Sequence, residues 1–121
     1  MRLGLLISAL LFAATPALAQ GGCVEPVAPL PVDGTAVTAD QLRAANTEAR
    51  SFISQSSVYQ ACLTSEVDAA KMQAQSEGRP FDPAIEADAK ARIAASEKSQ
   101  ERVGVAIDAA VTNYKLAHAA N

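Results

Sequence analysis

The sequence lacks the residues and motifs on which most enzymatic chemistry depends. It has one histidine, His118, no tryptophan, and only 4% aromatic residues. It contains no CxxC pair, no HExxH motif, no glycine-rich phosphate loop and no calcium-binding loop. His118 has no nucleophile or metal-ligand partner nearby in the sequence. We therefore expect no catalytic residues, no metal site and no cofactor, and a protein that is not an enzyme.

The chain also lacks an excess of positive charge. It has 10 Lys and Arg against 13 Asp and Glu, which gives a formal net charge of -3. No basic stripe interleaved with aromatic residues is present, so nucleic-acid binding is not expected. The abundance of alanine and the scarcity of aromatic residues favour slim, closely packed helices.

The first nineteen residues have the features of a secretory signal peptide. Arg2 supplies the positive start, residues 3–14 form an apolar core, and Ala17-Leu18-Ala19 resembles a cleavage site. The apolar core is too short for a permanent membrane anchor, and no later segment is apolar enough to span a bilayer. We expect export to the periplasm or secretion, with a mature chain that begins near Gln20 and has no transmembrane segment.

A lipoprotein is the main alternative to a freely exported chain. Cys23 lies close to the expected new N-terminus and could in principle carry a lipid. The preceding residues Gln20-Gly21-Gly22 place a polar glutamine where a lipobox has an apolar residue. Lipid anchoring at Cys23 is therefore not expected.

A long helix is predicted over residues 38–75. Thr38 and Gln41 have the spacing of a capping box, and Gly78-Arg79-Pro80 provides the stop. Residues with small or apolar side chains recur at alternating spacings of three and four, which places them on one face. They are Leu42, Ala45, Ala49, Phe52, Ser56, Tyr59, Leu63, Val67 and Ala70.

A second helix is predicted over residues 83–117. Asp82 and Pro83 are suited to the N-cap and first helical positions, and His118 is expected in a loose tail. Two long helices joined by a short loop must lie antiparallel as neighbours. The expected contacts are Leu63 with Ile93, Val67 with Ala89, Ala49 with Ile107, and Leu42 with Tyr114.

Cys23 and Cys62 are the two cysteines of the chain. In an oxidising compartment an even count favours a disulfide. The proline-rich segment before the first helix can turn at Asp33-Gly34 and run back along the helix to Cys62, with Val27, Leu30 and Val32 available to pack. Closing this loop of about forty residues would stabilise the fold by roughly 3 to 4 kcal/mol. An intermolecular bond or free thiols are the alternatives.

The predicted fold is all-α: an antiparallel two-helix hairpin, with coiled-coil-like packing, whose extended proline-rich N-terminal strap is disulfide-bonded to the first helix. The signal peptide is residues 1–19, the strap residues 20–37, and the helical hairpin domain residues 38–121. Two helices alone leave much apolar surface half covered. Either the strap shields this surface, or a second copy does so in a four-helix homodimer.

Two features of the predicted seam between the helices need an explanation. Ser56 falls opposite Gln100, with Ser96 and Ser99 nearby, so a polar layer interrupts the apolar contacts. Such a layer is typical of residues that fix helix register, with a slot for a polar ligand as the alternative. Gly104 lies inside the second helix, either to make room for a neighbouring side chain or as a plain surface glycine.

Seven segments of the mature chain are distinctive: the Cys23 region with its prolines, Val32-Asp33-Gly34, Thr38-Ala39-Asp40-Gln41-Leu42, Phe52-Ile53, Tyr59-Gln60-Ala61-Cys62-Leu63, Asp82-Pro83-Ala84-Ile85-Glu86 and Glu101-Arg102-Val103-Gly104. Together these segments resemble a group of small exported helical proteins of alphaproteobacteria that have no assigned function. The resemblance covers most of the mature chain. It implies a periplasmic helical hairpin and carries over no active-site residue.

Function by contact with another protein is the hypothesis that the sequence favours. The first version is an adaptor or accessory subunit of the bacterial envelope that docks a helix face on a protein partner. The alternative is a periplasmic chaperone-like or inhibitor-like binder of client proteins, which predicts an exposed, concave apolar face. The sequence does not identify the partner or the biological process.

Overall fold

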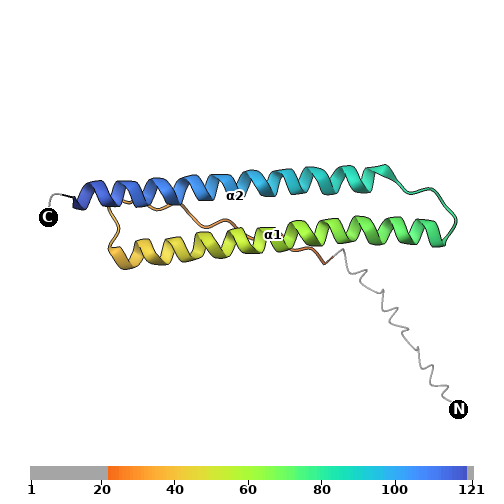
Figure 1. Ribbon diagram of the computed structural model, residues 1–121, viewed down its shortest axis with the longest axis horizontal. Coiled ribbons are helices and arrows are strands. Elements are labelled where there is room, and N and C mark those ends of the chain that lie inside the picture. Colours follow the sequence, from red (N-terminus) through yellow and green to blue (C-terminus); the bar gives the residue numbers. More distant parts are fainter. Residues whose placement is uncertain (1–21, 120–121) are drawn as a thin grey trace, which may run out of the picture.

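The computed structural model describes residues 22–119, in which two long helices form an antiparallel hairpin (Figure 1). Helix α1 spans Ala39–Ser76 and helix α2 spans Pro83–His118. The all-α hairpin predicted from the sequence is confirmed, and each helix boundary lies within one residue of the predicted one. The predicted signal peptide, residues 1–19, lies outside the described residues.

Local signals define the helix ends. The Thr38 hydroxyl accepts a hydrogen bond from the Gln41 amide at 3.2 Å, and the Gln41 side-chain oxygen accepts one from the Thr38 amide at 2.8 Å. The Asp82 carboxylate accepts from the Ala84 amide at 2.9 Å, with Pro83 in the first turn of α2. Gly78 follows α1 with φ of +63°, a left-handed conformation that glycine adopts without steric cost.

The core of the hairpin lies along the seam between α1 and α2. One buried cluster joins Tyr59, Leu63 and Val67 of α1 to Ala89 of α2 and to Cys23 of the strap, and partly buried Cys62, Phe81 and Ile93 pack against it. Leu63, Val67, Ala89 and Ile93 all lie in or against this cluster, which agrees with the predicted Leu63–Ile93 and Val67–Ala89 layers.

The N-terminal strap crosses the seam diagonally. It begins at the Cys23–Cys62 disulfide on α1, where the two Cα atoms are 5.6 Å apart, and reaches α2 at Ala110 through the backbone of Gly34. Figure 1 shows the strap in orange, running along the hairpin toward the end where α1 begins. The predicted intramolecular disulfide is therefore confirmed.

The strap turns its side chains differently from the prediction. Cys23 is buried and Pro26, Pro29 and Val32 are half-buried, so every third residue faces the helices. This three-residue period is that of a polyproline II helix. Val27 and Leu30 lie one position further along that period and are 91% and 88% exposed. The prediction that these two residues pack inward was wrong, whereas Val32 does pack.

A tight turn joins the strap to α1. The Asp33 carboxylate accepts hydrogen bonds from the amide and hydroxyl of Thr35, at 2.9 and 2.8 Å, and these bonds lower the pKa of Asp33 below its ordinary value. Gly34 is buried against α2 in this turn. A Cβ atom at Gly34 would overlap the carbonyl group of Ala110 and come within 2.9 Å of the Tyr114 nitrogen.

Two smaller expectations need correction. A Cβ atom at Gly104 would have no neighbour within 4 Å, so Gly104 does not make room for another side chain. His118 belongs to the last turn of α2 and not to a loose tail. Its ring stacks on Tyr114 with centroids 4.1 Å apart, and its Nδ1 lies 2.8 Å from the Tyr114 carbonyl oxygen.

Replacement by alanine should have opposite effects on stability at Gly34 and at Gly104. Gly34→Ala forces the strap away from α2, and we expect it to lower the free energy of unfolding by about 2 kcal/mol, as overpacking does. Gly104→Ala adds a methyl group in open space on a helix, and we expect a gain of about 1 kcal/mol. Urea unfolding of both variants measures the difference, and equal effects would contradict the close approach at Gly34.

Candidate functional site: the strap and the seam beneath it

The disulfide fixes the start of the strap over the middle of α1. Cys23 is 9% exposed, and Cys62 is half-buried beside Glu66. Donor atoms of these three residues lie within 4.8 Å of one another, as the ligands of a metal ion would. Both sulfur atoms are bonded to each other, however, and thiolates are the form of cysteine that binds metals. This cluster is therefore a structural anchor for the strap.

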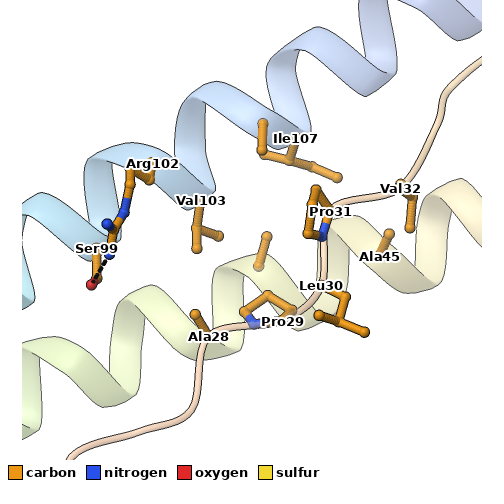
Figure 2. Close-up of a pocket in the computed structure, with 12 residues that line it drawn as sticks. Ala28, Pro29, Leu30, Pro31, Val32, Ala45, Ser99, Arg102, Val103 and Ile107 are labelled. Carbon is orange, nitrogen blue, oxygen red and sulfur yellow. Dashed lines mark hydrogen bonds between the residues drawn. The ribbon is translucent and has the colours of Figure 1, made fainter.

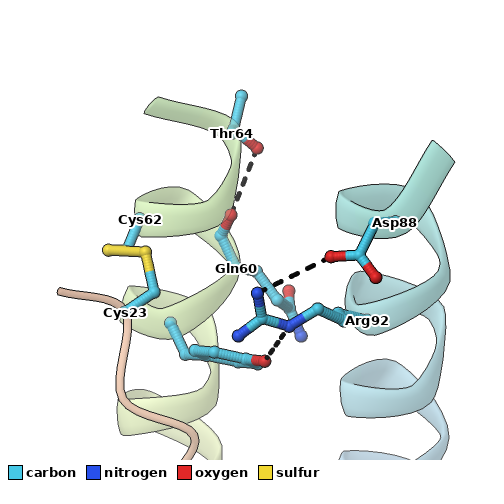
Figure 3. Close-up of a disulfide and its surroundings, with 7 residues drawn as sticks. Cys23, Gln60, Cys62, Thr64, Asp88 and Arg92 are labelled. Carbon is cyan, nitrogen blue, oxygen red and sulfur yellow. Dashed lines mark hydrogen bonds and ion pairs between the residues drawn. A yellow bond between two sulfur atoms is a disulfide. The ribbon is translucent and has the colours of Figure 1, made fainter. Parts of the chain in front are cut away.

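A polar group on α2 faces the disulfide region across the seam (Figure 3). Arg92 Nε donates a hydrogen bond to the Tyr59 hydroxyl at 3.0 Å, and its Nη1 lies 3.8 Å from the Asp88 carboxylate. The Tyr59 hydrogen bond is the main reason that the pKa of Arg92 is raised. The Arg92–Tyr59 hydrogen bond connects α2 to the segment of α1 that carries Cys62.

The predicted polar layer is present, and its central residue is Gln60. The Gln60 amide nitrogen donates to Ser96 Oγ at 3.1 Å and to Gln100 Oε1 at 3.2 Å. The Gln100 amide nitrogen in turn donates to the Ile53 carbonyl at 3.0 Å and to Ser57 Oγ at 3.3 Å. The layer joins the helices by hydrogen bonds, which is the structural role that the sequence favoured.

Ser56 does not take part in this hydrogen-bond network. Its side chain is fully buried, and its Oγ has no hydrogen-bond partner among the described residues. Sequence spacing placed Ser56 at the centre of the layer and missed Gln60. The long side chain of Gln60 reaches across the seam from a half-buried position, and residue spacing alone does not reveal such a reach.

The outward side of the strap presents a row of apolar side chains. Val24, Val27 and Leu30 are 82%, 91% and 88% exposed, and they recur every three residues. Val58 of α1 is 68% exposed and lines a shallow groove together with Val24. We call these four residues the outer strap surface.

The inward side of the strap covers a cavity of about 350 Å³ (Figure 2). Residues 28–32 of the strap line one side of it. Ala45 and Ala49 of α1 and the segment from Ser99 to Ile107 of α2 contribute the remainder. A second, smaller cavity of about 130 Å³ shares Ala28 and Ser99 with the first. The space exists because alanines on both helices, Ala45, Ala49 and Ala106, have side chains too short to fill the gap between the helices and the strap.

Comparison of the chain with protein-family models, with curated proteins and with solved structures gives no match. Neither α1 nor α2 contains an apolar segment long enough to cross a membrane.

Loss of the hydroxyl group should change the free energy of unfolding in opposite directions at the two buried serines, Ser56 and Ser96. In Ser56→Ala an unpartnered buried hydroxyl is removed, and we expect the free energy of unfolding to rise by about 1 kcal/mol. In Ser96→Ala the hydrogen bond from Gln60 is lost, and we expect a fall of about 1 kcal/mol. Urea unfolding of the pair is the measurement. A shift of the same sign in both variants would contradict the described polar layer.

Proposed function

We propose that the protein is a non-enzymatic component of the bacterial envelope that binds a partner protein through the outer strap surface. The observation that carries this proposal is the row formed by Val24, Val27 and Leu30. Three large apolar side chains point outward from a segment that a disulfide ties to the hairpin. Burial of such side chains is the main favourable contribution to protein association.

The anchoring of the strap supports a role in recognition. A free proline-rich segment would lose conformational entropy on binding, whereas a segment held at Cys23 and Gly34 is already ordered. Full burial of one Val or Leu side chain contributes about 1.5–3 kcal/mol. The row can therefore form the centre of an interface, with neighbouring polar residues at its rim.

This proposal moves the contact surface from a helix face to the strap. Within the outer strap surface, only Val58 comes from a helix, and it lines the same groove as Val24. Disulfides persist in oxidising compartments, which agrees with the export that the first nineteen residues indicate. A homodimer or a client-binding chaperone would use the same exposed side chains. Crosslinking in cells distinguishes these two alternatives from binding to a single heterologous partner.

The test places a photo-crosslinking amino acid at Leu30 in cells that export the protein. We expect one discrete heterologous product. Val27→Asp on the same chain should reduce its yield at least about tenfold, since a charge in an apolar interface costs more than about 1.4 kcal/mol.

Val105→Asp is the matched control, because Val105 is 64% exposed on α2 and lies outside the outer strap surface. Capture should be unchanged in this variant. Self-crosslinks alone would replace the proposal with a homodimer, and a smear of many proteins would replace it with a client binder. An equal loss of crosslinked product in Val27→Asp and Val105→Asp would show that the strap is not part of the interface.

A further inference from the structure

We propose that the cavity beneath the strap is a binding site for a free, linear aliphatic carboxylate. This inference goes beyond the protein contact proposed above, because it concerns the inward side of the strap and a small molecule. It is carried by the shape of the cavity, by the separation of its apolar and polar parts, and by the charge at their junction.

The larger cavity suits an unbranched hydrocarbon chain. Its volume of about 350 Å³ lies at the lower end of the range for small-molecule sites, about 300–1,000 Å³. Its lining is mainly apolar, with Pro29 and Val32 on the strap, Ala49 on α1, and Val103 and Ile107 on α2. Figure 2 shows Val103 and Ile107 on the side of the cavity opposite the proline-rich strap.

The smaller cavity next to it has three hydroxyl groups in its lining. Ser56, Ser96 and Ser99 all contribute to its wall, together with Glu25 of the strap. Ser56 is fully buried here with no hydrogen-bond partner among the described residues. An unpartnered buried hydroxyl costs free energy in the empty protein, so a polar group at this end would be stabilised. The Glu25 carboxylate disfavours an anion inside the smaller cavity, so the polar end of a ligand lies at the junction of the two cavities near Ser99, and its chain lies toward Ile107.

Arg102 determines the charge of that polar end. It lines the larger cavity and donates a hydrogen bond to Ser99 Oγ at 2.8 Å. Within residues 22–119, Arg102 and Arg50 have no carboxylate within 4.0 Å, whereas Arg43, Arg79 and Arg92 each have an acidic partner, and of the two unpaired arginines Arg102 is the one that lines the cavity. Ser99 lines both cavities, so the Arg102–Ser99 pair lies where the apolar and polar parts meet. A guanidinium with free donors at this position selects a carboxylate.

The experiment titrates decanoate into the isotope-labelled, disulfide-intact protein and follows backbone amide shifts by NMR below the concentration at which the probe forms micelles. We expect saturable shifts at the amides of Ala28, Leu30 and Val32 on the strap and of Val103–Ile107 on α2. Octanoate should bind about tenfold more weakly, because it buries two methylene groups fewer and each buried methylene contributes about fourfold in affinity. Absence of saturable shifts at these residues would overturn the site.

Two pairs of measurements distinguish a specific site from loose apolar adsorption. Ala106→Leu fills the cavity, and we expect it to abolish decanoate binding. Ala109→Leu makes the same change at an exposed position of α2 and should leave binding intact. Equal binding to both variants would place the probe elsewhere on the protein.

Arg102→Gln tests the head group separately from the fold, because Arg102 is exposed. We expect it to weaken decanoate at least about tenfold, as loss of a charge-assisted hydrogen bond does, and to leave binding of the neutral probe 1-decanol unchanged. An equal loss for both probes, or no loss for decanoate, would overturn the assignment of a carboxylate. The effect of Val27→Asp on crosslinking does not depend on this outcome, because Val27 lines neither of the two cavities, so the two proposals fail independently.

Discussion

The Cys23–Cys62 bond is the constraint on which the rest of the structure depends. Two helices with few aromatic residues bury a narrow seam, and the main buried cluster includes Cys23 itself. The bond holds one end of the strap on α1, and the close approach of Gly34 to Ala110 holds the other end on α2. Because both ends are fixed, the strap presents one row of side chains to solvent and covers a cavity with its inward side.

The features that could be predicted from the sequence are local or have few alternatives. The caps at Thr38 and Asp82 involve residues two or three positions apart, so their chemistry is readable directly. A short loop leaves an antiparallel pairing as the simplest arrangement of two long helices. The disulfide was predictable because two cysteines allow a single intramolecular pairing.

The features that could not be predicted depend on contacts between distant segments. The strap has nearly continuous apolar character, so its sequence does not show which of its three rows faces inward, and Val27 and Leu30 were misplaced. Gly34 is required by the backbone of α2 at Ala110, far away in the sequence. Gln60 reaches its partners Ser96 and Gln100 across the seam, at sequence separations of 36 and 40. The cavity follows from all these placements together and has no sequence signal of its own.

Amide hydrogen exchange of the disulfide-intact and reduced protein tests most directly whether the bond acts by holding the strap on the helices. If it does, reduction should lower protection more in residues 45–52 and 103–110, which lie beneath the strap, than in residues 70–74 and 84–88 near the interhelical turn. If the bond acts only by restricting the unfolded chain, amides in both regions should lose protection by the same factor. That uniform loss would contradict the central role of the anchored strap.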